Sequence, residues 1–327
     1  MNEKILRISR LSIIYGARRG FVKAVRDVSL DLYRGECLAL VGESGSGKTT
    51  LALSIVRALP TNAKIVSGNV YYHLDNNKEV DITKLTEDEM RKIRWREIAM
   101  VFQGSMNAFN PVLKIGDHFI ETAKAHRFAM DKNEIIEKAS NLLSLVLLDA
   151  KRVLNSYPHQ LSGGMKQRTL IALSLLLNPK IIIMDEPTSA LDVVSQKVVL
   201  NALSNIKKEL NLSMIFITHD LGITAEVADR VSVMYAGQIV EIGNVFEMYY
   251  DPLHPYTQGL LKAIPRLRGS VNITSIPGSP PDLINLPPGC SFHPRCPFAM
   301  DVCRREEPPM IEVDKNRFVK CWLYMKK

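Results

Sequence analysis

Residues 42–49 have the composition of a loop that binds phosphate groups. They read Gly-Glu-Ser-Gly-Ser-Gly-Lys-Thr and fit the pattern G-x-x-x-x-G-K-[ST] at every position. The glycines let main-chain N–H groups point at phosphate oxygens, and the start of the following helix adds its positive dipole end. The lysine can reach the β- and γ-phosphates, and the threonine hydroxyl can ligate Mg²⁺. The residues expected to contact the nucleotide are Gly42, Ser44, Gly45, Ser46, Gly47, Lys48, Thr49 and Thr50.

The flanks of this loop favour phosphate binding over a glycine- and serine-rich turn that matches the pattern by chance. The apolar run Cys37–Val41 precedes the loop and predicts a buried strand. Residues 50–59 follow it and predict a helix. A strand, a glycine-rich loop and a helix in this order are the context that a phosphate-binding loop needs.

Two carboxylates, Asp185 and Glu186, end an apolar strand predicted over 181–184. One carboxylate can hold Mg²⁺ through water, and the next can polarise an attacking water as a general base. The pair alone also fits the start of a turn, but the phosphate loop earlier in the chain strengthens the catalytic interpretation. Gln103 and His219 each follow a predicted strand and could contact the γ-phosphate or its water, although such isolated residues are more often structural.

A second anion-binding pattern, Ser162-Gly163-Gly164, stands before a helix predicted over 166–177. It offers a hydroxyl, bare main-chain N–H groups and a helix dipole. Two phosphate-binding elements in one chain leave two arrangements open. Either both face one nucleotide, or two chains share two nucleotides across a dimer interface. Tyr15 ends a predicted strand and could stack on a base, although a lone tyrosine more often packs in a core.

The elements around these motifs predict an α/β fold with a small antiparallel β layer and a helical middle over 104–160. The predicted strands cover 4–11, 12–15, 24–32, 37–41, 68–72, 79–82, 98–102, 181–184, 214–217, 231–235 and 238–242. The predicted helices cover 50–59, 86–96, 131–146, 166–177 and 195–209. A hairpin turn is expected at 75–77, and another at Ala236-Gly237.

Composition indicates an ordinary globular chain with a distinct tail. The chain has 327 residues, of which 46% are hydrophobic and 23% are charged. It contains no apolar run long enough to span a membrane and no secretory signal, so we expect a cytoplasmic protein. The net charge of +8 fits a solvated basic surface or a surface that faces a membrane, and dedicated nucleic-acid binding fits least. Twelve of the 17 prolines lie from Pro252 onward, which places a boundary near residue 251.

Residues 4–250 resemble the ATP-binding subunits of ABC transporters. The phosphate loop corresponds to their Walker A motif, 181–186 to Walker B, 161–165 to the signature and 189–192 to the D-loop. Gln103 falls at the Q-loop, His219 at the switch loop, and Tyr15 at the aromatic that stacks on adenine. The resemblance implies a P-loop NTPase fold of ABC type. It also implies ATP hydrolysis with Glu186, His219 and Gln103 as catalytic residues.

The same resemblance answers the question of the two phosphate-binding elements in favour of a dimer. In that family each ATP lies between the Walker A motif of one subunit and the signature of the other, here Ser162, Gly163 and Gly164 in trans. It implies Mg²⁺ held through Thr49, Gln103 and Asp185. It further implies that the helical middle meets the membrane subunits.

Three further segments, 157–168, 254–261 and 276–281, narrow the resemblance to the oligopeptide/dipeptide importer branch, with Met165 where most of the family has Gln. That branch imports di- and oligopeptides, and it has relatives for nickel and oligosaccharides. The implied partners are a second ABC ATPase, identical or related, two transmembrane permease subunits and, indirectly, an extracytoplasmic substrate-binding protein. The implied location is the cytoplasmic side of the membrane. A soluble ABC-type ATPase that serves no transporter and a metal- or redox-sensing regulator are the alternative classes.

Four of the five cysteines, Cys290, Cys296, Cys303 and Cys321, crowd the last 40 residues. Their spacing is not the C-x₂-C pattern of zinc sites, but four thiolates suit a tetrahedral Zn²⁺ or a [4Fe–4S] cluster. Free or disulfide-paired thiols are the third alternative. The tail resembles the C-terminal region of dipeptide-importer ATPases, some of which carry a [4Fe–4S] cluster, and this favours the cluster. The fifth, Cys37, is expected in the core.

The expected organisation has four parts. Residues 1–103 form the first part of the nucleotide-binding core and 104–160 the helical subdomain. Residues 161–250 form the second part of the core, and 251–327 form a C-terminal region with the cysteines.

Overall fold

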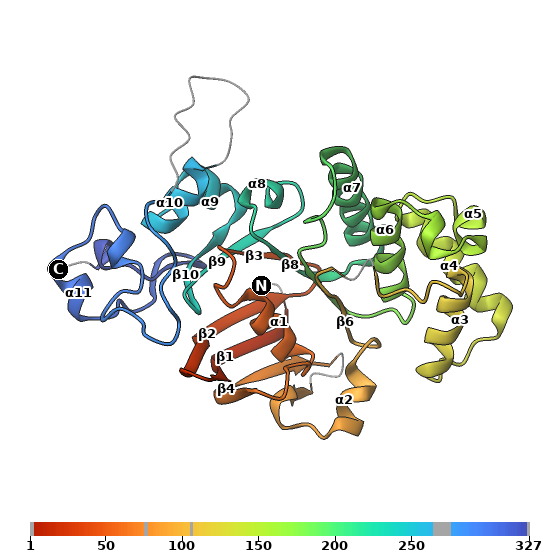
Figure 1. The fold of residues 1–327 in the computed structure, drawn as a ribbon, viewed down its shortest axis with the longest axis horizontal. Coiled ribbons are helices and arrows are strands. Elements are labelled where there is room, and N and C mark those ends of the chain that lie inside the picture. The colour runs from red at the N-terminus through yellow and green to blue at the C-terminus, as the bar shows by residue number, and fades with distance from the viewer. Residues whose placement is uncertain (1–2, 75–77, 105–106, 264–275, 326–327) are drawn as a thin grey trace. The chain divides into compact units, whose positions relative to one another are not determined.

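A computed structural model describes residues 3–74, 78–104, 107–263 and 276–325 (Figure 1). The turn expected at 75–77 lies outside the described residues. The chain divides into two compact units. Unit 1 consists of Met1–Leu85 and Ile217–Lys327, and unit 2 consists of Thr86–Phe216. Strand β8 (Ser213–Thr218) carries the chain from unit 2 back into unit 1.

Unit 1 contains an antiparallel sheet of which two strands precede the phosphate loop in the chain and two follow it. Its strand order is β2 (Gly20–Tyr33), β1 (Lys4–Ala17), β4 (Ala63–His73) and β5 (Glu79–Asp81). Strand β1 pairs with β2 and β4 in antiparallel register (Figure 1). The expected antiparallel β layer is therefore confirmed.

The prediction of separate strands over 4–11 and 12–15 is wrong, because β1 is continuous. Arg10 and Asp27 both have positive φ, 48° and 49°, where the register of the β1–β2 pair shifts. Ser29 Oγ accepts from the Arg10 N–H at 3.0 Å, and Ser12 Oγ accepts from the Asp27 N–H at 3.0 Å. A bulge closed by side-chain hydroxyls thus replaces the break that the sequence pattern indicated.

A second group of strands in unit 1 includes β3 (Cys37–Val41), which is buried throughout. It lies parallel to β9 (Arg230–Tyr235), which pairs antiparallel with β10 (Gln238–Asn244). The β9–β10 hairpin turns at Ala236 and Gly237, with φ of 47° and 82°. Two residues with positive φ form the kind of turn that matches the twist of a hairpin, which confirms the hairpin expected there.

Beyond residue 251, the described part of the chain consists of short elements, and two of its segments bind to β10. Strand β12 (Arg317–Val319) pairs with β10 and with β11 (Ile311–Asp314). Glu241 on β10 is fully buried, and its carboxylate accepts from the N–H groups of Leu253 and His254 at 2.7 and 2.9 Å. The helical elements of unit 1 are α1 (Lys48–Ile55), η1 (Ile82–Lys84), α8 (Leu221–Thr224), α9 (Val245–Tyr250), α10 (Pro255–Lys262), η4 (His293–Arg295), α11 (Asp301–Arg305) and η5 (Trp322–Tyr324).

Unit 2 combines a parallel strand pair with a helical group. Strand β6 (Ile98–Val101) lies parallel to β7 (Ile181–Asp185). Capping boxes at Thr86 and Asp131 open two of its helices, as local sequence predicts. The helical elements are α2 (Glu87–Ile93), α3 (Ile115–Ala125), α4 (Lys132–Leu145), α5 (Ala150–Asn155), η3 (Pro158–Gln160), α6 (Gly163–Ser174) and α7 (Val193–Leu210) (Figure 1).

Three helices begin earlier than predicted, and the first of them is α1, which starts at Lys48 and not at 50. Helix α6 starts at Gly163 and not at 166, because Ser162 caps it. Helix α7 starts at Val193 and not at 195, because Asp192 Oδ1 accepts from the Ser195 N–H at 2.9 Å. Across the described residues, no helix is both long and apolar enough to cross a membrane.

Candidate nucleotide site

The phosphate loop follows β3 and ends where α1 begins, at Lys48. Gly47 has φ of 106°, and a Cβ there would lie 2.2 Å from the carbonyl oxygen of Ala24, so only glycine fits. The buried Lys48 ammonium donates to the carbonyl oxygens of Gly42 at 2.7 Å and Glu43 at 2.9 Å. The loop therefore holds its cation against its own main chain, at the start of a helix where anions are favoured.

Tyr15 lies beside the first turn of α1. Its hydroxyl is 3.0 Å from the hydroxyl of Thr50, and its side chain is half-buried. Thr49 in the same turn is exposed, so its hydroxyl is accessible to a ligand. The structure thus brings Tyr15 to the phosphate-loop helix, and base stacking on its ring stays a prediction.

In unit 2, Gln103 and Glu186 meet at one edge of the strand pair. Strands β6 and β7 are parallel and in register from Ile98 to Val101, so the residues that follow them emerge on the same side. Gln103 Nε2 donates to Glu186 Oε2 at 3.0 Å. Asp185, the last residue of β7, is 1% exposed. A buried carboxylate next to a partly exposed one provides separate oxygens for a cation and for a water.

The main chain at Glu186 is strained, with φ of 48°. Its carbonyl oxygen accepts from the hydroxyl of Ser189 at 3.1 Å and from the Ser189 N–H at 3.3 Å. These bonds fix the turn that presents the carboxylate. Strain of this kind often lies at functional positions because the surroundings must maintain it.

The signature segment forms the start of α6. Ser162 Oγ accepts from the N–H of Met165 at 3.3 Å, and Ser162 and Gly163 are exposed. Gly164 is buried, and a Cβ there would lie 3.2 Å from Ser195 on α7. Ser162 and the first residue of this twelve-residue helix are therefore exposed, where a phosphate group can reach them.

The predicted site residues divide between the units. Unit 1 holds the phosphate loop, Tyr15 and the exposed His219, which directly follows β8. Unit 2 holds Gln103, the two carboxylates and the signature segment.

Comparisons with known proteins decide the family. Residues 25–189 match the family model described as ABC transporter, and residues 240–303 match that described as oligopeptide/dipeptide transporter, C-terminal region. The chain is 46% identical to the dipeptide transport ATP-binding protein DppD of Caldanaerobacter subterraneus, with 98% of this chain and 97% of that one aligned. It is 45% identical to DppD of Bacillus subtilis, over 98% and 95%. The chain belongs to the ABC transporter family.

A solved structure agrees with this assignment. The dimeric ATP-binding cassette MJ0796, in a post-hydrolysis state bound to ADP and Pi, has a TM-score of 0.64 and 29% identity, over 74% of this chain and 99% of that one. The expected P-loop fold of ABC type is confirmed, and the chain is an ABC-type ATPase. The roles of individual residues stay predictions.

The four tail cysteines of this ABC ATPase line one small pocket. His254, Phe292 and Trp322 are among its other lining residues. Burial raises the pKa of the Cys290 and Cys321 thiols to about 11. All five cysteines are free thiols. Across the described residues, no three His, Cys, Asp or Glu side chains are arranged as metal ligands.

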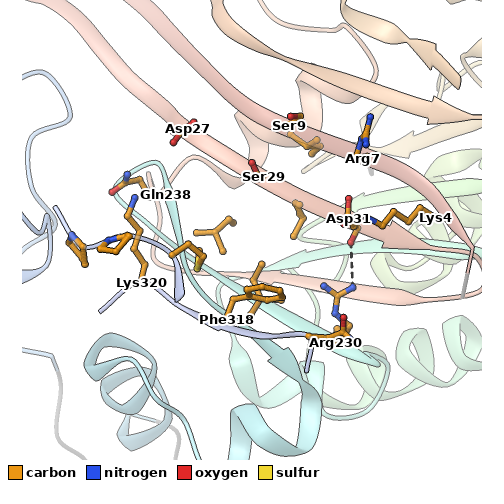
Figure 2. Close-up of a pocket in the computed structure, with 18 of the residues that line it drawn as sticks. Lys4, Arg7, Ser9, Asp27, Ser29, Asp31, Arg230, Gln238, Phe318 and Lys320 are labelled. Atoms are coloured by element: carbon orange, nitrogen blue, oxygen red, sulfur yellow. Dashed lines mark hydrogen bonds and ion pairs between the residues drawn. The ribbon is translucent and has the colours of Figure 1, made fainter. Parts of the chain in front are cut away.

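A separate cavity of ≈ 820 Å³ lies in unit 1 (Figure 2). Its cations have acidic partners. Lys4 pairs with Asp31 at 2.7 Å, and Lys320 pairs with Glu307 at 2.6 Å. Arg230 pairs with Glu36 at 2.9 Å and donates to the carbonyl oxygen of Asp31 at 3.4 Å. Such balanced charge does not suit a nucleotide, so the phosphate loop stays the predicted ATP site.

Sequence reasoning missed two residues that contact the phosphate loop. Arg295 forms an ion pair with Glu43 at 2.7 Å, and the Tyr256 hydroxyl accepts from the Glu43 N–H at 2.9 Å. Both lie in parts of the C-terminal region that carry the resemblance. Tyr256 belongs to the segment 254–261, and Arg295 directly precedes Cys296. The motifs were therefore visible in the sequence, but the sequence did not show that these two residues contact the phosphate loop.

Proposed function

We propose that this chain is the ATP-hydrolysing subunit of a membrane importer of di- and oligopeptides. The observation that carries the proposal is the match of its residues 240–303 to the C-terminal region of oligopeptide/dipeptide transporters. That region lies outside the part that matches the general ABC model, so it supports a branch of the family and not only an ATPase.

The phosphate loop and the α1 N-terminus bind the ATP phosphates, with Lys48 as the cation. Mg²⁺ suits the oxygen donors of Thr49, Gln103 and Asp185, and it neutralises phosphate charge when bound. Glu186 accepts a proton from the attacking water, and the amide of Gln103 orients the Glu186 carboxylate through their 3.0 Å bond. His219 contacts the γ-phosphate.

Two exposed residues of the signature segment, Ser162 and Gly163, support a dimer in which two ATP molecules are each shared by two subunits. Ser162 and Gly163 offer a hydroxyl and a helix N-terminus that a nucleotide on a second ATPase subunit can reach. The remaining partners are two permease subunits, contacted by the helical subdomain 104–160, and an extracytoplasmic substrate-binding protein. The chain then works at the cytoplasmic face of the membrane.

Reconstitution tests this function. The chain is assembled in proteoliposomes with its partner ATPase, its permease subunits and the cognate binding protein, and ATP-dependent uptake of labelled dipeptide, oligopeptide, nickel and oligosaccharide is measured. Peptide uptake that requires ATP supports the proposal. Uptake of nickel or oligosaccharide alone contradicts the peptide assignment. Failure to co-purify with any membrane subunit contradicts the transport role.

We also propose that Cys290, Cys296, Cys303 and Cys321 hold a [4Fe–4S] cluster, with Zn²⁺ as the alternative. The fit rests on the donor set, because all four thiols line one pocket, although no three His, Cys, Asp or Glu side chains of the described residues stand at metal-ligand spacing. Burial raises the pKa values of the Cys290 and Cys321 thiols, and the positive charge of a bound metal would lower them again. The centre would stabilise a region built of short elements.

Cys296→Ser is expected to remove most of the bound metal and to lower the melting temperature of the C-terminal region, while ATP binding persists. The physical reason is the loss of one of four ligands. Iron, zinc and sulfide analysis after anaerobic purification, with a visible spectrum, checks this. Cys37→Ala is the matched control, because Cys37 is a buried thiol in β3 and outside the pocket. Equal metal content in wild type and Cys296→Ser would contradict the site.

A further inference from the structure

Glu43, the second residue of the phosphate loop, is held at three points. Its N–H donates to the Tyr256 hydroxyl at 2.9 Å, and its carbonyl oxygen accepts from Lys48 Nζ at 2.9 Å. Its carboxylate receives two bonds from Arg295, at 2.7 and 2.9 Å. Two of these three contacts come from the C-terminal region, more than 200 residues along the chain.

Other contacts of Arg295 hold its side chain in place for the ion pair with Glu43. It ends η4, is 6% exposed, and its Nε donates to the carbonyl oxygen of Pro277 at 2.8 Å. Its guanidinium lies over the ring of Tyr235, 5.8 Å from the centroid. These contacts orient the planar guanidinium group toward the Glu43 carboxylate. A bidentate pair of this kind fixes the relative position of the two side chains more tightly than a lysine could.

Tyr256 is fixed by an aromatic cluster. It is fully buried in the first turn of α10, with ring centroids 4.6 Å from Tyr235 and 5.4 Å from Phe292. Phe292 also lines the cysteine pocket. Packed side chains therefore run from the cysteine pocket to the main chain of the phosphate loop.

We propose that Arg295 and Tyr256 are positioning residues for ATP binding, through which the C-terminal region sets the conformation of the phosphate loop at Glu43. The Glu43 carbonyl oxygen is one of the acceptors that hold the Lys48 ammonium. Fixing both the N–H and the carboxylate of Glu43 fixes that carbonyl oxygen, and with it the lysine. The C-terminal region thus contributes to nucleotide affinity without touching the nucleotide.

Arg295→Met tests the ion pair in the full-length chain. We expect the KM for ATP to rise about tenfold, the loss typical of one charge-assisted contact, with kcat within about twofold of wild type. Arg295→Lys restores part of the affinity, because it keeps the charge but not the fork. Tyr256→Phe keeps the aromatic packing and removes the acceptor of the Glu43 N–H, and it is expected to raise the KM about threefold.

Arg317→Met is the matched control. Arg317 is also a buried arginine of the C-terminal region, and it pairs with Asp251 at 3.0 Å, away from the loop. This variant should lower the melting temperature and leave the KM for ATP unchanged. An Arg317→Met variant that raises the KM as much as Arg295→Met would overturn the proposal, because both would then act through general loosening.

A double-mutant cycle adds a decisive readout. Glu43→Gln combined with Arg295→Met should raise the KM no further than either single change, because both remove the same contact. Additive effects, or an unchanged KM in Arg295→Met, would overturn the proposal. If Arg295→Met fails to fold, Glu43→Gln and Tyr256→Phe carry the same test, and wild-type KM in both overturns it. The KM for ATP is independent of the imported substrate, so these results stand apart from the peptide-uptake test.

Discussion

Glu186→Gln is expected to abolish multiple-turnover ATP hydrolysis and to leave ATP binding intact. A general base in this position contributes roughly 10²–10⁴-fold to the rate, and an amide cannot accept the proton of the attacking water. The substitution preserves shape, so a glutamine at this position can still accept the 3.0 Å bond from Gln103. Steady-state hydrolysis and equilibrium binding of a fluorescent ATP analogue measure the two properties separately.

Glu209→Gln provides the control for this experiment, because Glu209 is an exposed glutamate near the end of α7. It should hydrolyse ATP at the wild-type rate. Repeated turnover at the wild-type rate in Glu186→Gln would remove Glu186 as the base. A loss of ATP binding in that variant would instead indicate a role in holding the nucleotide.

Lys48→Met is expected to weaken ATP binding by more than about a hundredfold. The Lys48 ammonium is the cation that the phosphate loop itself supplies. The substitution removes its contacts to charged phosphate oxygens, which are among the stronger polar interactions. Met keeps the length and apolar stem of the side chain, so the buried position stays filled. Titration calorimetry with ATP and Mg²⁺ measures the affinity directly.

Lys64→Met is the matched control, because Lys64 is an exposed lysine of β4. Its affinity for ATP should equal that of the wild type. Retained affinity in Lys48→Met would show that the loop's main-chain N–H groups suffice for binding. That result would contradict the assignment of Lys48.

Short-range patterns were sufficient for much of the fold. The phosphate loop depends on residue types within eight positions, and the φ of 106° at Gly47 needs glycine. The capping boxes at Thr86 and Asp131 also act over three residues, so their helices could be predicted. The β1 bulge could not, because its stabilising hydroxyls belong to the paired strands and act only after pairing.

The sequence by itself therefore determined the family and the phosphate loop, because both depend on contiguous motifs, and it supplied the candidate residues. Only the tertiary structure decided which of those residues meet. Gln103 and Glu186 are 83 residues apart and come together because β6 and β7 lie parallel in one register. Arg295 and Glu43 are 252 residues apart, and their contact depends on how the C-terminal region packs around Tyr235. Such contacts leave no periodic or local signal, since their partners are selected by packing and not by spacing along the chain.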